Sequence, residues 1–428
     1  MIFSKYSVES SIRGISNLRF SVEKIIIERF FNCRKSSPNF LLGSLKFLAS
    51  LSKIKEMEFN DVFVFWLGVI LAPLFLFLIV VMRPIVKIRV ARVSLTYFGQ
   101  GFLSAEKAAL QVEYARSHSE LDIGLCYISG RDVSQGILTR FLKEKFVSSP
   151  IFGGCFYLIH WLGIEHTYAL PSMPFGSERD FDGLFDRYQS EFRDFLGVPD
   201  HFDIIKSKRV LCLYCREDQY RNSDHNSNYR GLTDYYLSIL EKIEPPDDFI
   251  FIGLGGFDCP EFDGLGDKAL SLTKLTGIPD IKKLFSVVDT CELFISFAGG
   301  GVSSVPLVLR KKVLCIDFDP LTFFSGYENC FTRFAEYGGS SFKTDLNAFV
   351  GKRLQQHGEG EKTERPKHIT VKELSRILTP VFRNGDFSSH EWPMASNERV
   401  GGFVRALMSR YPRFQKWHST ERISNILL

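Results

Sequence analysis

Residues 209–224 read RVLCLYCREDQYRNSD, an apolar run that passes directly into charged and polar side chains. The run at 209–214 predicts a strand buried on both faces, as in a parallel sheet covered by helices. Ligands of open α/β sheets bind beyond the carboxyl ends of the strands. Arg216, Arg221 and Asn222 follow that end, and each guanidinium can donate two parallel hydrogen bonds to a diphosphate. The alternative is a solvated loop whose charges pair with one another.

A second candidate segment follows the strand predicted at 292–297. There the chain reads AGGGVSS, a glycine turn that opens a predicted helix. Glycines let the backbone approach a ligand closely, N–H groups at a helix start attract phosphate, and serines can cap the helix or donate to the phosphate. Glycine turns also serve packing alone, so the turn indicates a diphosphate site mainly together with the arginines. Its candidate residues are Gly299, Gly300, Gly301, Ser303 and Ser304.

Strands and helices alternate on both sides of these segments. Apolar runs at 85–93, 121–128, 249–252 and 313–317 predict further strands, and helical patterns recur between them. Such alternation is typical of a doubly wound parallel sheet. We therefore expect an α/β fold of two Rossmann-like domains joined near residue 200, the architecture of a two-domain nucleotide-sugar enzyme.

One segment departs from this pattern. Residues 62–82 (VFVFWLGVILAPLFLFLIVVM) carry no charge, and as a helix they would extend about 31 Å, one hydrocarbon thickness. The segment begins too far along the chain, and lacks a small-residue cleavage site, for a signal peptide. We expect it to span a membrane. Pro73 leaves a re-entrant path open, and a buried core helix is the remaining alternative.

Basic residues flank the apolar segment. Arg83, Lys87, Arg89 and Arg92 follow it, with no acidic residue before Glu106. The positive-inside rule therefore favours the inner, cytoplasmic membrane, with the residues after 82 facing the cytoplasm. Residues 1–61 mix basic and apolar side chains, which suits either an amphipathic helix on an anionic membrane or a soluble cap helix.

These patterns divide the chain into five parts. They are a basic, partly amphipathic segment at 1–61, a transmembrane or re-entrant helix at 62–82, a first Rossmann-like domain at 83–200, a second at 201–350, and a linker with C-terminal helices at 351–428. We assign the acceptor side to the first domain and nucleotide-sugar binding to the second, and expect the C-terminal helices to pack back onto the body.

Composition narrows the class of protein. Hydrophobic residues make up 45% and charged residues 24% of the chain, which is typical of a packed globular protein rather than a disordered or collagen-like one. The formal net charge of +4 is too close to neutral to indicate nucleic-acid binding. Nine scattered cysteines do not form a disulfide framework and favour a reducing compartment.

Two short motifs offer metal chemistry. Cys212 and Cys215 form a C-x-x-C, but positions three apart on a strand point to opposite faces, so we expect core cysteines. Asp317 and Asp319 form a D-x-D after a strand, which could hold a divalent metal against a diphosphate. The motif lies late in the chain, after two runs of alternating strands and helices of the Rossmann-like type. We therefore expect neither a metal nor another cofactor.

Taken together, the motifs resemble a group of bacterial glycosyltransferases of the GT-B type. That group carries an arginine-rich C-L-H-V-R-D…R-N-S-D signature, and here the matching residues are CLYCRE at 212–217 and RNSD at 221–224. RPIVKIR at 83–89, FLGVP at 195–199 and CELFISFAGG at 291–300 follow the group's order as well. Tyr214 replaces the group's histidine and Glu217 its aspartate, which puts activity in question if the histidine serves catalysis.

The resemblance implies a membrane-anchored glycosyltransferase that uses a nucleotide-diphospho-sugar donor to build a surface polysaccharide or glycoconjugate. The group's similarity to fucosyltransferase-like folds implies donor binding without a metal, with arginine meeting the diphosphate charge. The acceptor would be a membrane lipid or lipid-linked, and Glu217 is the candidate catalytic base or a partner that orients Arg216. The alternatives are an inactive membrane-bound sugar-binding or assembly protein, and a metal-dependent transferase that uses Asp317 and Asp319.

Overall fold

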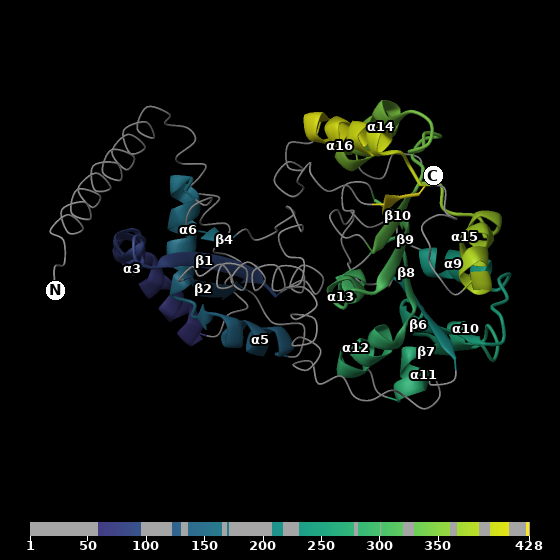
Figure 1. Ribbon diagram of the computed structural model, residues 1–428, viewed down its shortest axis with the longest axis horizontal. Coiled ribbons are helices and arrows are strands. Elements are labelled where there is room, and N and C mark those ends of the chain that lie inside the picture. The colour runs from purple at the N-terminus through teal and green to yellow at the C-terminus, as the bar shows by residue number, and fades with distance from the viewer. Residues whose placement is uncertain are drawn as a thin grey trace, which may run out of the picture. The chain divides into compact units, whose positions relative to one another are not determined.

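The computed structural model describes twelve stretches of the chain (Figure 1). They are residues 59–95, 122–129, 136–164, 169–170, 208–216, 231–277, 281–299, 301–319, 329–359, 366–384, 394–410 and 425–427. The chain divides into two compact units. Unit 1 comprises residues 1–96 and 111–172, and unit 2 comprises 97–110 and 173–428.

Unit 1 contains a parallel four-stranded sheet in the order β3-β2-β1-β4. The two long strands, β1 and β2, pair over their whole length, from Lys87 opposite Asp122 to Ser94 opposite Ser129. The described elements of the unit are α3 (Phe59–Met82), β1 (Lys87–Ser94), β2 (Asp122–Ser129), α5 (Ile137–Lys145), β3 (Val147–Ser148), α6 (Phe152–Leu162) and β4 (Ala169–Leu170).

The apolar segment of the sequence forms α3, and this helix packs against α6 and β1. Phe65, Leu76 and Ile79 of α3 are buried in one cluster with Val90 of β1 and Ile159 of α6. Among the described residues α3 is the one helix long and apolar enough to cross a membrane, judged by length and composition alone.

Unit 2 contains a seven-stranded sheet in the order β11-β10-β9-β8-β5-β6-β7, parallel throughout. Chain order runs outward from β5 to β7 on one side and from β8 to β11 on the other. The direction of winding therefore reverses between β5 and β8, which is the topological switch point of a doubly wound sheet. The strands are β5 (Arg209–Cys215), β6 (Phe249–Gly255), β7 (Ala269–Ser271), β8 (Leu293–Phe297), β9 (Lys312–Phe318), β10 (Cys330–Phe334) and β11 (Asn425–Ile426).

Unbroken apolar runs explain why β5 and β8 occupy the middle of the sheet. Every residue of β8 is buried, as is every residue of β5 after Arg209, because helices cover both faces of a parallel sheet. In the part of unit 2 that the structure describes, the helices are α9 (Leu232–Leu240), α10 (Pro260–Asp263), α11 (Leu272–Thr276), α12 (Ile281–Thr290), the 3-10 turn η5 (Gly301–Ser303), α13 (Ser304–Val308), α14 (Leu346–Glu359), α15 (Val371–Asn384) and α16 (Asn397–Arg410).

The structure confirms the α/β class with parallel sheets, while the proposed boundary near residue 200 and the segment before residue 59 lie outside the described residues. Two features differ from the expectation. The linker expected in the part at 351–428 does not begin at residue 351, since α14 continues to Glu359. The C-terminal part also contributes a strand, β11, to the edge of the sheet, which its short length conceals in the sequence.

Candidate functional site

The carboxyl edge of the unit 2 sheet brings the two sequence-predicted segments together. Cys215, the last residue of β5, lies opposite Phe297, the last residue of β8. Arg216 and Ala298 are the next residues on these neighbouring strands. The predicted arginine segment and the predicted glycine turn therefore leave the sheet side by side, at the switch point where doubly wound sheets bind ligands.

The backbone turns sharply where β8 ends. Ala298 and Gly299 both have left-handed backbones, with φ of 57° and 77°, and Ala298 N–H donates to the Ile316 carbonyl at 2.8 Å. A side chain at Gly299 would be strained by this φ, and its Cβ would lie 3.3 Å from Phe318 Cζ. Non-glycine residues held at positive φ occur preferentially at binding sites, so Ala298 supports a ligand site at this edge.

The serines of the glycine turn are more deeply placed than the sequence suggests. Ser303 and Ser304 are fully buried, and the Ser303 hydroxyl shares a hydrogen bond of 2.6 Å with that of Ser296. The turn continues as a single 3-10 turn, Gly301–Ser303, into the five-residue helix α13. A helix this short has little dipole, so the attraction for an anion has to come from backbone N–H groups. A phosphate contact by either serine stays a prediction.

Four residues of the predicted site lie outside the described residues. They are Glu217, Arg221, Asn222 and Gly300. Their predicted roles therefore stay predictions, and the geometry of the site depends on Arg216 and Gly299.

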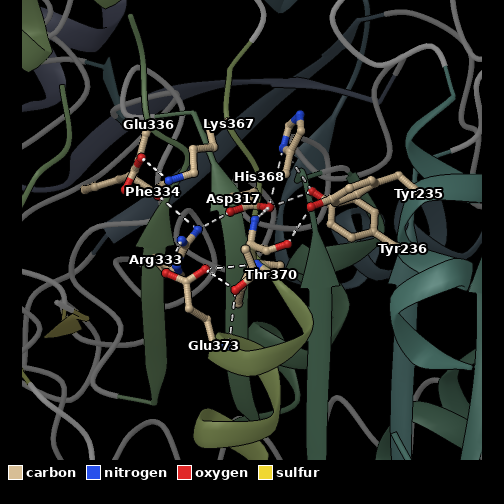
Figure 2. Close-up of polar contacts among 11 residues, drawn as sticks. Tyr235, Tyr236, Asp317, Arg333, Phe334, Glu336, Lys367, His368, Thr370 and Glu373 are labelled. Carbon is tan, nitrogen blue, oxygen red and sulfur yellow. Dashed lines mark hydrogen bonds and ion pairs between the residues drawn. The ribbon is translucent and has the colours of Figure 1, made fainter. Parts of the chain in front are cut away.

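A second polar cluster lies at the same edge, and of its residues the sequence analysis considered only Asp317, as part of the D-x-D motif (Figure 2). We call it the Asp317 cluster; it comprises Asp317, Arg333, Tyr236, His368 and Glu373. Asp317, near the end of β9, has a φ of 55° and a fully buried carboxylate. Arg333 of β10 donates to its Oδ1. Tyr236 OH and the Ile369 N–H donate to its Oδ2 at 2.9 and 2.7 Å, and His368 Nδ1 lies 3.4 Å from the same atom.

The outer side of the Asp317 cluster caps α15. Thr370 and Glu373 bond reciprocally, with Thr370 N–H donating to Glu373 Oε2 at 2.9 Å, while Arg333 Nη2 lies 3.2 Å from Glu373 Oε1. Burial alone would raise the pKa of Glu373, but the Thr370 donors and the charge of Arg333 outweigh it and lower that pKa. The T-x-x-E pattern at 370–373 is a capping box, a signal by which the sequence could have revealed this helix start.

Tyr236 donates a hydrogen bond into this cluster from α9. Burial, and then the charge of Asp317, raise the pKa of Tyr236 well above its usual value. The phenol therefore stays protonated and acts as a donor. Its ring also packs on Phe297, with centroids 4.6 Å apart, so the Asp317 cluster is in direct contact with the end of β8.

Both carboxylates of the D-x-D motif are held by arginines. Asp317 pairs with Arg333, and Asp319 accepts a two-pronged contact from Arg353, with Nε to Oδ1 at 2.9 Å and Nη2 to Oδ2. The charges that would attract a divalent cation are thus already neutralised. Among the described residues no group of three metal-ligating side chains occurs.

The two cysteines of the C-x-x-C have separate surroundings, as the sequence predicts. Cys212 Sγ lies 3.8 Å from the Val287 carbonyl, whereas Cys215 Sγ lies 3.8 Å from the Thr233 hydroxyl. Both side chains are fully buried, and burial raises the pKa of Cys212 well above its usual value. These are core thiols rather than a redox pair.

Comparison with known proteins yields distant structural neighbours. No protein-family profile and no curated protein matches the chain. Solved structures similar to it include the glycosyl transferase family 9 protein from Veillonella parvula, with 10% identity, a TM-score of 0.35, and 69% of this chain and 97% of that chain covered. Another is the glycosyltransferase SnogD from Streptomyces nogalater, with 11% identity, a TM-score of 0.23, and 69% and 99% covered.

A third similar structure is a protein from Listeria monocytogenes assigned as a UDP-N-acetylglucosamine 2-epimerase. Its identity is 12% and its TM-score 0.26, with 68% of this chain and 95% of that chain covered.

Proposed function

We propose that the chain is a GT-B glycosyltransferase that binds a nucleotide-diphospho sugar at the carboxyl edge of unit 2. The observation that carries this proposal is that β5 and β8 end side by side at the switch point, with Arg216 directly after β5 and Gly299 two residues after the end of β8. A guanidinium beside a backbone turn of positive φ offers a diphosphate both charge and close approach.

Chemistry at this site would consist of charge stabilisation. Departure of the leaving group places negative charge on a diphosphate, and preorganised donors aimed at that charge lower the barrier. Arg216 and Arg221 would supply the charge, Asn222 a polar contact, and the Gly299–Gly301 turn backbone N–H groups. The alternative use of Asp317 and Asp319 with a metal is less favoured, since Arg333 and Arg353 already neutralise both carboxylates.

The proposal extends to the cellular setting. We place the enzyme at the cytoplasmic membrane with unit 2 in the cytoplasm, because the basic residues after α3 suit the anionic cytoplasmic leaflet. A membrane lipid or a lipid-linked molecule would then be the acceptor, and a surface polysaccharide or glycoconjugate the product. A sugar-binding or assembly protein without activity is the second candidate, favoured by Tyr214 at the position where the resembled group has histidine.

Arg216→Ala is expected to weaken donor binding about 10- to 150-fold. The change removes a charge-assisted contact of about 1.5–3 kcal/mol, at about 1.4 kcal/mol per factor of ten. Arg216→Lys should recover only part of the loss, because an ammonium cannot reproduce the guanidinium fork. Calorimetric titration of the full-length protein with a panel of UDP-, GDP- and ADP-sugars measures the effect.

Arg383→Ala provides the matched control. Arg383 is exposed in the last turn of α15, so its removal should leave donor affinity unchanged. Equal donor affinity in wild type and Arg216→Ala would refute the assignment of the phosphate site. Wild-type protein that binds donor but transfers no sugar would favour the inactive sugar-binding alternative.

Glu217→Gln separates the two roles available to that carboxylate. A general base lost from the site should leave donor affinity intact and lower turnover about 100-fold or more, whereas a lost partner of Arg216 should lower affinity and turnover together. We expect the second result, because a carboxylate beside arginines is usually an ion-pair partner. The same titrations, combined with a sugar-transfer assay, measure both quantities.

A further inference from the structure

The apolar helix α3 has two different faces. One face is buried in unit 1 by Phe65, Ala72, Leu76 and Ile79. The opposite face presents large apolar side chains to the outside, among them Ile70 at 73%, Phe77 at 61% and Leu74 at 57% exposed. A helix with this division is held to a folded domain along one side and leaves the other side for an apolar partner.

Contact between α3 and unit 1 runs along most of the helix. Phe65 and Ile79, both buried in the unit 1 core, are about 21 Å apart along the axis at 1.5 Å per residue. A glycine crossing also fixes α3 to α6. A Cβ on Gly154 of α6 would fall onto the backbone of Gly68 of α3, and a Cβ on Gly68 would fall onto Ile151. The two helices therefore touch backbone to backbone.

A transmembrane orientation conflicts with this packing. If α3 crossed a bilayer, β1 and the rest of the four-stranded sheet that it packs on would enter the hydrocarbon as well. Among the described residues that sheet is open, with edges at β3 and β4, and unpaired strand edges do not occur in contact with lipid. An orientation in the plane of the membrane keeps the sheet outside and buries only the outer face of α3.

The distribution of charged residues around α3 indicates the kind of membrane surface that its outer face would bind. After Asp61 no acidic residue occurs before Glu106, and α6 (Phe152–Leu162) contains no Asp, Glu, Lys or Arg. The exposed Arg83 and Lys87 directly follow α3. Trp66 of α3 and Trp161 of α6 are both exposed, and tryptophan is enriched at membrane interfaces. Beyond Asp61 in the first turn of α3, this apolar surface has no acidic residue and is followed by basic ones, which matches an anionic leaflet.

We propose that the outer face of α3, together with Trp161 of α6, inserts in plane into one leaflet of an anionic bilayer. Unit 1 is then a monotopic membrane domain, and the chain enters and leaves the membrane on the same side. This arrangement replaces the spanning orientation expected from the sequence. It is independent of the sugar chemistry proposed for unit 2.

Flotation of the full-length protein with lipid vesicles tests whether the outer face of α3 binds a membrane. The protein is synthesised in a cell-free system with preformed phosphatidylcholine vesicles, with or without 30 mol% phosphatidylglycerol, and vesicle-bound protein is measured. We expect stronger binding to the anionic vesicles, and a roughly tenfold or greater loss for Leu74→Asn or Phe77→Asn. Val147→Asn changes a comparably exposed apolar residue on β3 and should bind as wild type. Failure to float, or equal binding by all variants, would overturn the proposal.

Orientation is tested in the same vesicles with an epitope tag at each end of the chain. Insertion in plane leaves both tags open to protease added outside, since neither end crosses the bilayer. Protection of one tag would show that α3 spans the membrane and would also overturn the proposal. Both experiments measure only membrane attachment, so a negative result would not bear on the proposal that Arg216 binds the donor.

Discussion

Replacing Asp317 with alanine is expected to lower the free energy of unfolding of unit 2 by about 3–5 kcal/mol, the usual cost of removing one partner of a buried ion pair. The carboxylate is fully buried and the Arg333 side chain is only 9% exposed. Without Asp317 the guanidinium keeps the contact with Glu373, at 3.2 Å, and a long hydrogen bond to the Phe334 carbonyl, at 3.4 Å. Tyr236 OH and the Ile369 N–H lose their acceptor at the same time.

Hydrogen exchange followed by mass spectrometry measures this loss within unit 2. Peptides that contain β9 and residues 366–384 should lose protection by about two to three and a half orders of magnitude, as about 1.4 kcal/mol per factor of ten requires. Asp317→Asn should be intermediate, because the amide oxygen still accepts hydrogen bonds while the charge is gone. Peptides of unit 1 should not change.

Glu292→Ala is the matched control for the Asp317 pair. Glu292 also binds a guanidinium by two prongs, since Arg209 Nε and Nη2 lie 2.9 and 2.6 Å from its oxygens, but this pair is on the surface. Exposed pairs contribute at most about 1 kcal/mol. If both alanine variants lowered the free energy of unfolding by the same amount, burial would not explain how the Asp317 cluster stabilises unit 2.

The central strands of unit 2 could be predicted because local pattern alone determines them. An unbroken apolar run such as 209–214 or 292–297 has few uses besides a strand covered on both faces. Short edge strands lack that signal: β11 has two residues and forms only because β10 offers an open edge. Helix α6 was also missed, since its uniformly apolar sequence has no amphipathic period and its place depends on the glycine contact with α3.

The candidate site, like the fold, could be predicted only in part from the sequence. The positions of Arg216 and Gly299 at the carboxyl edge of the sheet could be predicted, because each lies within two residues of the end of a recognisable strand. Their role in binding stays a prediction. The Asp317 cluster depends on contacts between distant parts of the chain, with Tyr236 and Asp317 separated by 81 residues and Tyr236 and His368 by 132. No spacing rule connects such residues. In the sequence Asp317 stands out only as part of a D-x-D motif, and that motif does not indicate that Asp317 pairs with Arg333.

Replacing Gly154 with valine is expected to separate α3 from α6 and to destabilise unit 1 by about 3 kcal/mol or more. A new Cβ at this position would fall onto the backbone of Gly68 and Val69. Backbone cannot move aside as a flexible side chain can, and overpacking of a tight contact usually costs 1–3 kcal/mol even where side chains can yield. Peptides covering α3 and α6 should exchange amide hydrogens about 100-fold faster, while β5 and β8 of unit 2 keep their protection.

Gly401→Ala and Gly154→Ala together test whether the glycine crossing is the cause. Alanine in a helix interior normally stabilises by up to about 1 kcal/mol relative to glycine, and Gly401 of α16 has room for it, since the nearest atom to a new Cβ is the end of the Arg405 side chain at 3.4 Å. Alanine at Gly154 meets backbone instead. The same substitution should therefore stabilise at Gly401 and destabilise at Gly154. Stabilisation at both positions would mean that α3 and α6 do not touch at Gly154, and the in-plane attachment would lose the contact that holds the two helices as one surface.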